Sequence, residues 1–424
     1  MRLSTARWIL AAFVICSSAI ALRYRDGHDF THNIWAPIHG LVNGLDPYDP
    51  GNEQYYDRYH VPVVAGPYTP AALTLFAPLA LVSPPWAADI IALLSVAALW
   101  VGVVLLIPPR SARSYVVAAV AGGLVVLSAP AQDTIYLGQL SGFAFLGFAM
   151  IIAGLRRGPS ATWFCAVGAA LVSLKPQSGI PILVALAILG LWRVVGRAVL
   201  LLVVASLPGV VLLFRVVGSP ATITRVVGDN LDLLTRLPPG DLTNPTNLRI
   251  DVLGLLAHLG GPALTGLLWT GVAFVIITML FALVPRGSFD LDEVPLTHPY
   301  VATLVGAYLV GSLYHLMYDQ VLLYVGPVAA IGLVGTRQDA SLRQRFVAAG
   351  GLVLLGFGVM FRVGFRNLMM ALDIPNLAVH TLWVTVPTLL SIAIVAGGPI
   401  YKLYIAKRSA LRIIRPAPND GGRG

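Results

Sequence analysis

"SATWFCAVGAALVSLKPQSGIPILVALAILGLW", residues 160–192, holds two apolar runs joined by one charged turn. Each run has about 15 residues and would span roughly 22 Å as a helix, whereas a hydrocarbon core is about 30 Å thick. The turn at 174–178 should therefore lie below a membrane surface. It contains Lys175, which is the only lysine before Lys402. The stretch predicts a pair of membrane helices with a recessed cation between them.

The whole chain shares this apolar character. Of its 424 residues, 57% are hydrophobic and 11% are charged, and the mean hydropathy is +0.81. A soluble domain carries about 25% charged residues. The composition thus predicts an all-α polytopic membrane protein. Cys16 and Cys165 both lie in apolar runs, which excludes a disulfide framework and a cysteine-based metal site.

Apolar segments predict about twelve transmembrane helices. They fall at 8–22, 86–107, 114–130, 140–155, 160–174, 178–192, 198–217, 262–284, 299–316, 320–335, 346–361 and 376–400. Two arginines precede the first segment, as in a signal peptide, and we interpret it as a retained signal anchor. The further apolar stretch 67–84 is interpreted as an interfacial or re-entrant helix.

The distribution of charged residues predicts the orientation of these helices in the membrane. With both termini cytoplasmic, most Lys and Arg side chains lie inside and most acidic ones outside, as the positive-inside rule requires. The net charge of +9 then reflects cytoplasmic loops and a basic tail at 402–424 that contacts membrane lipids. We expect no nucleic-acid partner.

The two long loops, 23–85 and 218–261, face the extracytoplasmic side of the cytoplasmic membrane. Residues 1–424 form one integral membrane domain. Because long loops are usually functional, the active site is expected on that outer side.

Lys175 is the first candidate for chemistry. A cation at this depth costs a few kcal/mol unless it is paired, so an anionic partner is expected. The phosphate of a lipid carrier would suit that position. The alternative is that the lysine extends to the membrane surface.

The first outer loop begins "RYRDGHDFTHNIW", residues 23–35, with Asp26 and Asp29 directly after the first span. A carboxylate at the mouth of a membrane cavity can act as a general base towards a hydroxyl. The two acids could instead form a solvated cluster or cap the next helix. His28 and His32 lack the spacing of metal ligands, so we expect no metal and no cofactor.

Four more polar residues fall at predicted outer boundaries or in the second long loop. "LYHLMYDQVLLY", residues 313–324, places His315 and Asp319 at i and i+4 on one helix face. They could line a cavity or close a packing contact. Gln139, in "YLGQLSG", and Arg249, at the start of an amphipathic stretch, could bind sugar or phosphate or cap helices.

Taken in order, these motifs resemble glycosyltransferase family 87. The segments are "DF" (29–30), "GLVNGLDPYDP" (40–50), "YTPAALTLFAPLALV" (68–82), "GQLSGF" (138–143), "GAALVSLKPQSGIPIL" (168–183) and "YHLMYDQVLLYVGP" (314–327). The resemblance covers roughly residues 20–335 and departs at Tyr68-Thr69-Pro70, where members commonly have Tyr-Pro-Pro. It implies a GT-C-type fold with interfacial helices in the outer loops.

The resemblance also implies a chemistry. Such enzymes are similar to mannosyltransferases that use polyprenyl-phosphate-mannose, and relatives transfer arabinofuranose from a decaprenyl-phosphate donor. Asp29 would be the acid at the transfer centre, Lys175 would lie on the donor phosphate, and His315 would face the same cavity.

Our prediction is therefore transfer of a sugar, with mannose favoured, from a polyprenyl-phosphate sugar donor to an extracytoplasmic glycolipid or glycan acceptor. The predicted catalytic residues are Asp29 and His315, and the predicted substrate-binding residues are Lys175, Asp26, Tyr68, Gln139, Arg249 and Asp319. The alternatives are an arabinofuranosyltransferase, a lipid-linked sugar transporter or flippase, and an envelope scaffold. Inverted repeats, which would favour the transporter, are not evident in the sequence.

Overall fold

The structure is a computed structural model in which helices account for every regular element of the described residues. These residues are 1–23, 26–46, 68–221, 224, 242, 249–258, 264, 267–288, 298–313, 315–336, 342–360, 385–387 and 389–390. Within them the only β pairing is an isolated antiparallel bridge between Arg249 and Leu316. The prediction of an all-α protein is confirmed for this part of the chain.

The helices differ widely in length. The long ones are α1 (Leu3–Leu22), α6 (Pro84–Leu106), α12 (Trp192–Val217) and α15 (Leu267–Ser288). The shorter ones are α5 (Pro70–Phe76), α7 (Ala112–Leu127), α8 (Ala129–Leu137), α9 (Ser141–Arg157), α10 (Thr162–Val172), α11 (Pro176–Ile188), α14 (Val252–His258), α16 (Pro299–Ser312), α17 (Val325–Thr336) and α18 (Leu342–Met360). In the first outer loop lie α2 (His28–Phe30), the π-helix η1 (Thr31–Trp35), α3 (Ala36–Val42) and, after α5, the 3-10 helix η3 (Ala77–Leu81); η4 (Pro159–Ala161) and η6 (Met317–Tyr324) are also 3-10 helices.

Fewer helices than expected have the length and hydropathy of a membrane span. In the described part four qualify, namely α1, α6, α12 and the combined helix Met317–Thr336. A fifth is added if α7 and α8, bent by 61° at their junction, count as one broken span. The first eleven predicted segments each coincide with a helix, but the count of about twelve spans is not confirmed. The twelfth segment, 376–400, and the tail at 402–424 lie almost wholly outside the described residues.

The helices pack in layers around the combined helix Met317–Thr336. That helix buries most of its length, whereas α12 leaves most of its apolar side chains exposed. A helix that contacts lipid can expose apolar side chains, because these side chains are favourable in lipid and unfavourable in water. Next to these layers, α9 packs on α6 and α10, α1 on α7, and α12 on α5.

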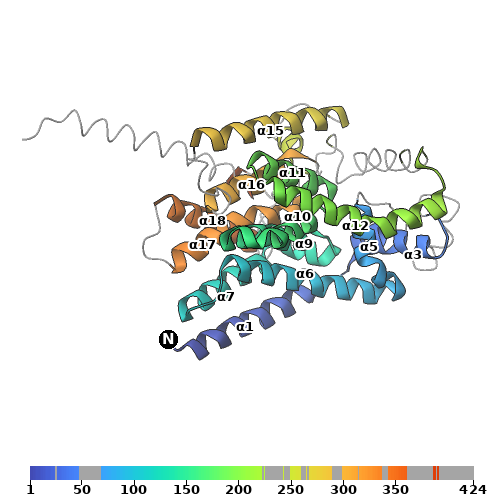
Figure 1. Cartoon of the computed structure of the whole chain (residues 1–424). Helices are drawn as coiled ribbons and strands as arrows, with labels where there is room; N and C mark the ends of the chain where they lie inside the picture. Colours follow the sequence, from blue (N-terminus) through green and yellow to red (C-terminus); the bar gives the residue numbers. More distant parts are fainter. Residues whose placement is uncertain are drawn as a thin grey trace, which may run out of the picture.

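The two ends of the bundle are formed by different parts of the chain. The N-terminus lies at one end, and α3 and α5 of the first outer loop lie at the opposite end (Figure 1). Arg7, Arg157 and Arg197 each stack over an aromatic ring, of Tyr115, Phe164 and Trp163 respectively. Arginine and aromatic side chains suit a membrane–water interface.

Candidate active site

The start of the loop 23–85 is held against the end of α8 by its backbone. The N–H groups of Asp26 and Gly27 donate to the carbonyl of Tyr136 over 3.0 and 2.7 Å. Gly27 has a φ of 67°, and a Cβ there would lie 2.4 Å from the Cβ of Ala88. Only glycine permits both this conformation and this approach. The contact brings Asp29 beside the turn that follows α8.

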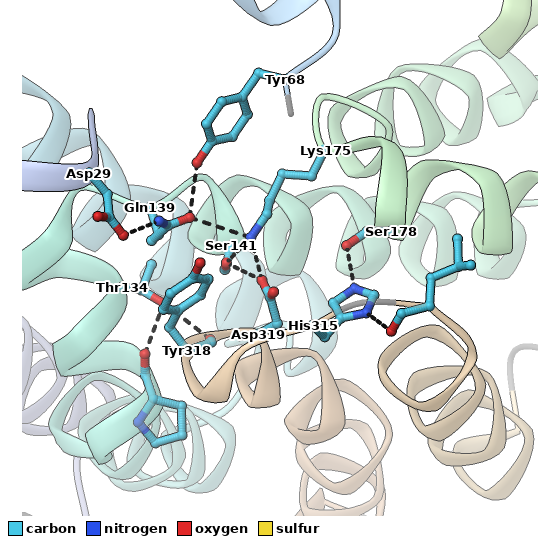
Figure 2. Close-up of polar contacts among 12 residues, drawn as sticks. Asp29, Tyr68, Thr134, Gln139, Ser141, Lys175, Ser178, His315, Tyr318 and Asp319 are labelled. Carbon is cyan, nitrogen blue, oxygen red and sulfur yellow. Dashed lines mark hydrogen bonds and ion pairs between the residues drawn. The ribbon is translucent and has the colours of Figure 1, made fainter. Parts of the chain in front are cut away.

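Gln139, in that turn, is the centre of the polar site. Its Nε2 donates to Asp29 Oδ2, and its Oε1 accepts from the Tyr68 hydroxyl over 3.0 Å and from Lys175 Nζ over 3.4 Å (Figure 2). It does not cap the next helix, since Leu140 is the N-cap of α9 and no side chain bonds there. Of the two interpretations of Gln139, the structure therefore favours a polar site over a helix cap.

Lys175 is buried at the N-cap position of α11 and is ion-paired. Its Nζ lies 2.6 Å from Asp319 Oδ1 and 3.3 Å from Ser141 Oγ, and 4.7 Å from the centre of the Tyr318 ring. The side chain is 2% exposed, so it does not extend to the membrane surface. With Gln139 included, each of the three ammonium hydrogens has an acceptor. The anionic partner is thus a carboxylate of the protein itself.

Asp319 completes this part of the network. Its Oδ1 also accepts from the Ser141 hydroxyl over 2.5 Å, while its buried Oδ2 has no hydrogen-bond partner among the described residues. An unbonded buried carboxylate oxygen is costly. The ion pair with Lys175 is therefore needed to keep Asp319 charged in this place.

His315 does not bond to Asp319, contrary to the predicted i, i+4 pair. Residues 315–316 precede the 3-10 helix η6, so the two side chains do not share an α-helical face. The ring Nδ1 of His315 lies 3.0 Å from the Leu313 carbonyl and must carry a proton to bond there. In the neutral ring Nε2 then accepts from the Ser178 hydroxyl, 3.1 Å away. Figure 2 shows His315 and Asp29 on opposite sides of the Lys175–Asp319 pair.

Arg249 lies in a second cluster behind His315. Its guanidinium makes two bonds of 2.8 and 2.9 Å to Asp251, and its side chain is 2% exposed. Asp251 in turn accepts from the backbone N–H of His315 over 3.4 Å and from two N–H groups of the first turn of α14. The Ile250 N–H donates to the His315 carbonyl over 3.0 Å. The segment 249–254 is thus fastened to the segment that carries His315.

The site thus places a carboxylate, Asp29, and a buried cation, Lys175, on either side of one amide. The family model for glycosyltransferase family 87 matches residues 67–311, which is more than half of the chain. The chain belongs to glycosyltransferase family 87. No curated protein and no solved structure matches it.

Family membership makes the chain a glycosyltransferase, and its long apolar helices indicate that this family 87 member is a membrane protein. The matched range includes Tyr68, Gln139, Lys175 and Arg249. Asp29 and Asp319 lie beyond its two ends, yet they join the network through residues within it.

The electrostatics of the outer residues suit proton transfer. Burial raises the pKa of the Asp29 carboxyl, while the hydrogen bond from Gln139 and the charges of His28 and Lys175 oppose that rise. Burial lowers the pKa of His32 to about 4, so this ring is neutral at pH 7. Burial likewise raises the pKa of Tyr68, which remains a neutral donor towards Gln139. A carboxyl with a raised pKa is a stronger base than an exposed one.

The predicted site residues therefore divide into three groups. Asp29, Tyr68, Gln139, Lys175 and Asp319 form one hydrogen-bonded network. His315 and Arg249 belong to the second cluster, and Asp26 is exposed at the loop surface. Among the described residues, no group of three His, Cys, Asp or Glu side chains is placed to hold a metal.

Sequence reasoning missed Ser141, Ser178 and Asp251. The signal for Ser141 was present, because it follows Gln139 within the same short polar motif. Ser178 lies in the same polar turn as Lys175, and Asp251 lies two residues after Arg249, but nothing in their spacing links them to His315.

Proposed function

We propose that this family 87 member transfers a sugar, with mannose favoured, from a polyprenyl phosphate to a hydroxyl of an extracytoplasmic glycolipid or glycan. The observation that supports this most directly is the Asp29 carboxylate, which is partly buried and is oriented by Gln139 in the segment that precedes α3. A base in that place can meet an acceptor from the aqueous side and a donor from the lipid.

In the proposed reaction the acceptor hydroxyl oxygen attacks the anomeric carbon of the donor sugar. Its proton passes to Asp29, the bond from the anomeric carbon to the phosphate oxygen breaks, and that oxygen keeps the electron pair. The products are the glycoside and the polyprenyl phosphate. An in-line displacement of this kind inverts the anomeric centre. General-base assistance of this type contributes about 10²- to 10⁴-fold to the rate.

The leaving phosphate requires compensation of its growing negative charge. Lys175 is the favoured cation, because a preorganised cation in a water-poor site stabilises such charge strongly. Since its three hydrogens are already bonded, a phosphate has to replace one acceptor. The contacts to Ser141, at 3.3 Å, and to Gln139, at 3.4 Å, are both weaker than the 2.6 Å ion pair with Asp319, and we expect one of these two to yield.

Arg249 and His315 support this centre in the proposal and do not touch the substrate. The Arg249 charge is neutralised by Asp251 through two hydrogen bonds. His315 is fully buried, and both of its ring nitrogens are engaged. The second cluster would position the segment before Asp319.

The test is sugar transfer in membranes that contain the overproduced protein. The membranes receive radiolabelled polyprenyl-phosphate-mannose and native lipid extract. Wild type is compared with Asp29→Asn and with Asp26→Asn. Asp26 was predicted to bind substrate, but it is exposed at the loop surface, apart from the hydrogen-bonded network, so in this proposal it is the control. We expect a new labelled glycolipid with wild type and with Asp26→Asn. At equal protein level, Asp29→Asn should form at least about 10²-fold less of this product.

Other results would redirect the proposal. Equal product from all three proteins would remove Asp29 from the reaction. Product only with a decaprenyl-phosphate-arabinofuranose donor would favour the arabinofuranosyltransferase. Movement of a lipid-linked sugar across the membrane without any transfer would favour the flippase.

A further inference from the structure

Gln139 connects two charged groups that do not touch each other. Asp29 and the Lys175–Asp319 ion pair have no direct bond in the described part of the chain, and both bond to the Gln139 amide. Figure 2 shows the amide between them, with the Tyr68 hydroxyl approaching from above.

We propose that Gln139 is a positioning residue that couples the buried Lys175–Asp319 ion pair to Asp29 and holds the Asp29 carboxylate in place as the base of sugar transfer. This inference rests on the proposed function. The amide bonds to Oδ2 of Asp29, which leaves Oδ1 to receive the proton of the acceptor hydroxyl.

The orientation of the amide follows from its neighbours. Lys175 is a donor only, and an ionised carboxylate is an acceptor only. Turning the amide over would place its oxygen against Asp29 and its NH₂ against the ammonium group of Lys175. Tyr68 adds a second donor on the side of Oε1. Lys175 and Tyr68 therefore fix which end of Gln139 faces Asp29.

The ion pair in turn fixes Lys175. Its Nζ bonds to Asp319 Oδ1, which is also held by the Ser141 hydroxyl. The chain of contacts thus runs from α9 and η6 through Lys175 and Gln139 to the first outer loop. A movement of any residue in this chain of contacts would change the position of the Asp29 carboxylate through Gln139.

This coupling has a measurable electrostatic consequence. A hydrogen bond to the ionised form of a carboxyl favours that form, so its removal should raise the pKa of Asp29. The other charged groups that act on Asp29 are His28, Lys175 and Asp26, and the adjoining helices α6 and α8 also carry Asp89 and Asp133. None of these is changed by substitution of Gln139.

The test compares Gln139→Met with Gln132→Met. Methionine matches glutamine in length and removes the amide. Gln132 is also buried, but its Nε2 bonds only to a backbone carbonyl, that of Val126. Tyr68→Phe is a third variant, which removes one hydroxyl and keeps the ring in case Gln139→Met fails to fold.

Two readouts are needed. The first is the titration of Asp29 by infrared difference spectroscopy, with Asp29→Asn in each background as the reference. The second is the pH dependence of kcat/KM for sugar transfer. We expect Gln139→Met to raise the midpoint of both by about one unit or more, Tyr68→Phe to raise them less, and Gln132→Met to leave them unchanged.

The outcomes separate this inference from the proposed function. An unchanged Asp29 titration in Gln139→Met would overturn the coupling, even if turnover fell. A shifted titration in a protein that transfers no sugar would support the coupling and refute the proposed function. If Gln139→Met does not fold, an unchanged titration in Tyr68→Phe would overturn the coupling.

Discussion

Lys175 and Asp319 are a buried charge pair whose members depend on each other. Removal of one partner of such a pair costs about 3–5 kcal/mol, because the other charge stays buried and unpaired, whereas replacement of both by apolar residues is often close to neutral. Asp319 already has one unbonded oxygen, which adds to its dependence on Lys175.

We therefore expect Lys175→Met to lower the melting temperature strongly and the double variant Lys175→Met/Asp319→Leu to recover much of that loss. Sugar transfer should stay low in both, because neither retains the cation. The measurement is the fraction of protein that remains monodisperse in detergent after heating. If the double variant loses as much thermal stability as the two single substitutions lose in sum, the two charges are independent.

Arg249 allows a test of positioning against phosphate binding. Lysine keeps the charge but loses the two-bond geometry with Asp251. Arg249→Lys should lower the free energy of unfolding by about 1–3 kcal/mol, since a buried acceptor loses a partner. The KM for the donor should not change. A raised donor KM at unchanged thermal stability would instead place Arg249 on the phosphate.

The residue types of the site could be predicted from the sequence, but most of their partners could not. Lys175 is conspicuous because a cation is rare and costly between apolar runs. Its partner Asp319 lies 144 residues further along the chain, and only the folded structure brings the two together. The predicted pair of His315 and Asp319 assumed an α-helix where the chain forms an extended segment and then a 3-10 helix.

Among the helices, α9 and α10 come into backbone contact at two glycines. A Cβ on Gly168 would lie 2.5 Å from the carbonyl oxygen of Gly147. Helix α9 begins at Ser141 and α10 leads to Lys175, so their separation bears directly on the site.

We expect Gly168→Ala to lower the free energy of unfolding by about 1–3 kcal/mol, because the helices must move apart. The matched control is Gly196→Ala in α12, where a Cβ would meet no atom within 4 Å. That control should gain about 0.5–1 kcal/mol from the better helix propensity of alanine. Thermal unfolding of both variants decides the matter; equal stability would mean that α9 and α10 can adjust without cost.

The π-helical and 3-10-helical segments are the part of the fold that could not be predicted from the sequence. The π-helix Thr31–Trp35 follows Asp29, and the eight-residue 3-10 helix Met317–Tyr324 contains Asp319. Such turns are uncommon and often occur at functional sites. Hydrophobic periodicity cannot distinguish them from α-helix over so few residues. Asp29 thus lies just before an irregular helical segment, and Asp319 lies within another.

For the whole molecule, the positions of the helices were predictable and the number of spans was not. The length of each apolar run locates a helix well, because burial in lipid and burial in a protein core require the same side chains. It does not show which segments cross the membrane alone. Several helices here, such as α11 with 13 residues, are shorter than a span. Short helices that end within the bundle allow Lys175 to lie inside it and not at its surface.

The orientation of the bundle is the property on which the proposed reaction depends most. In a protein whose cysteines are replaced by alanine, we would place a single cysteine at Asn43 or at Ser160, both exposed. Asn43 follows α3 in the first outer loop, and Ser160 lies between α9 and α10 beside Arg157. The positive-inside rule predicts that Ser160 is cytoplasmic and Asn43 is outside. A membrane-impermeant maleimide should therefore label Asn43→Cys in intact cells and Ser160→Cys only after permeabilisation. The reverse pattern would place Asp29 in the cytoplasm, where acceptors outside the cell could not reach it, and transfer on the extracytoplasmic side would be excluded.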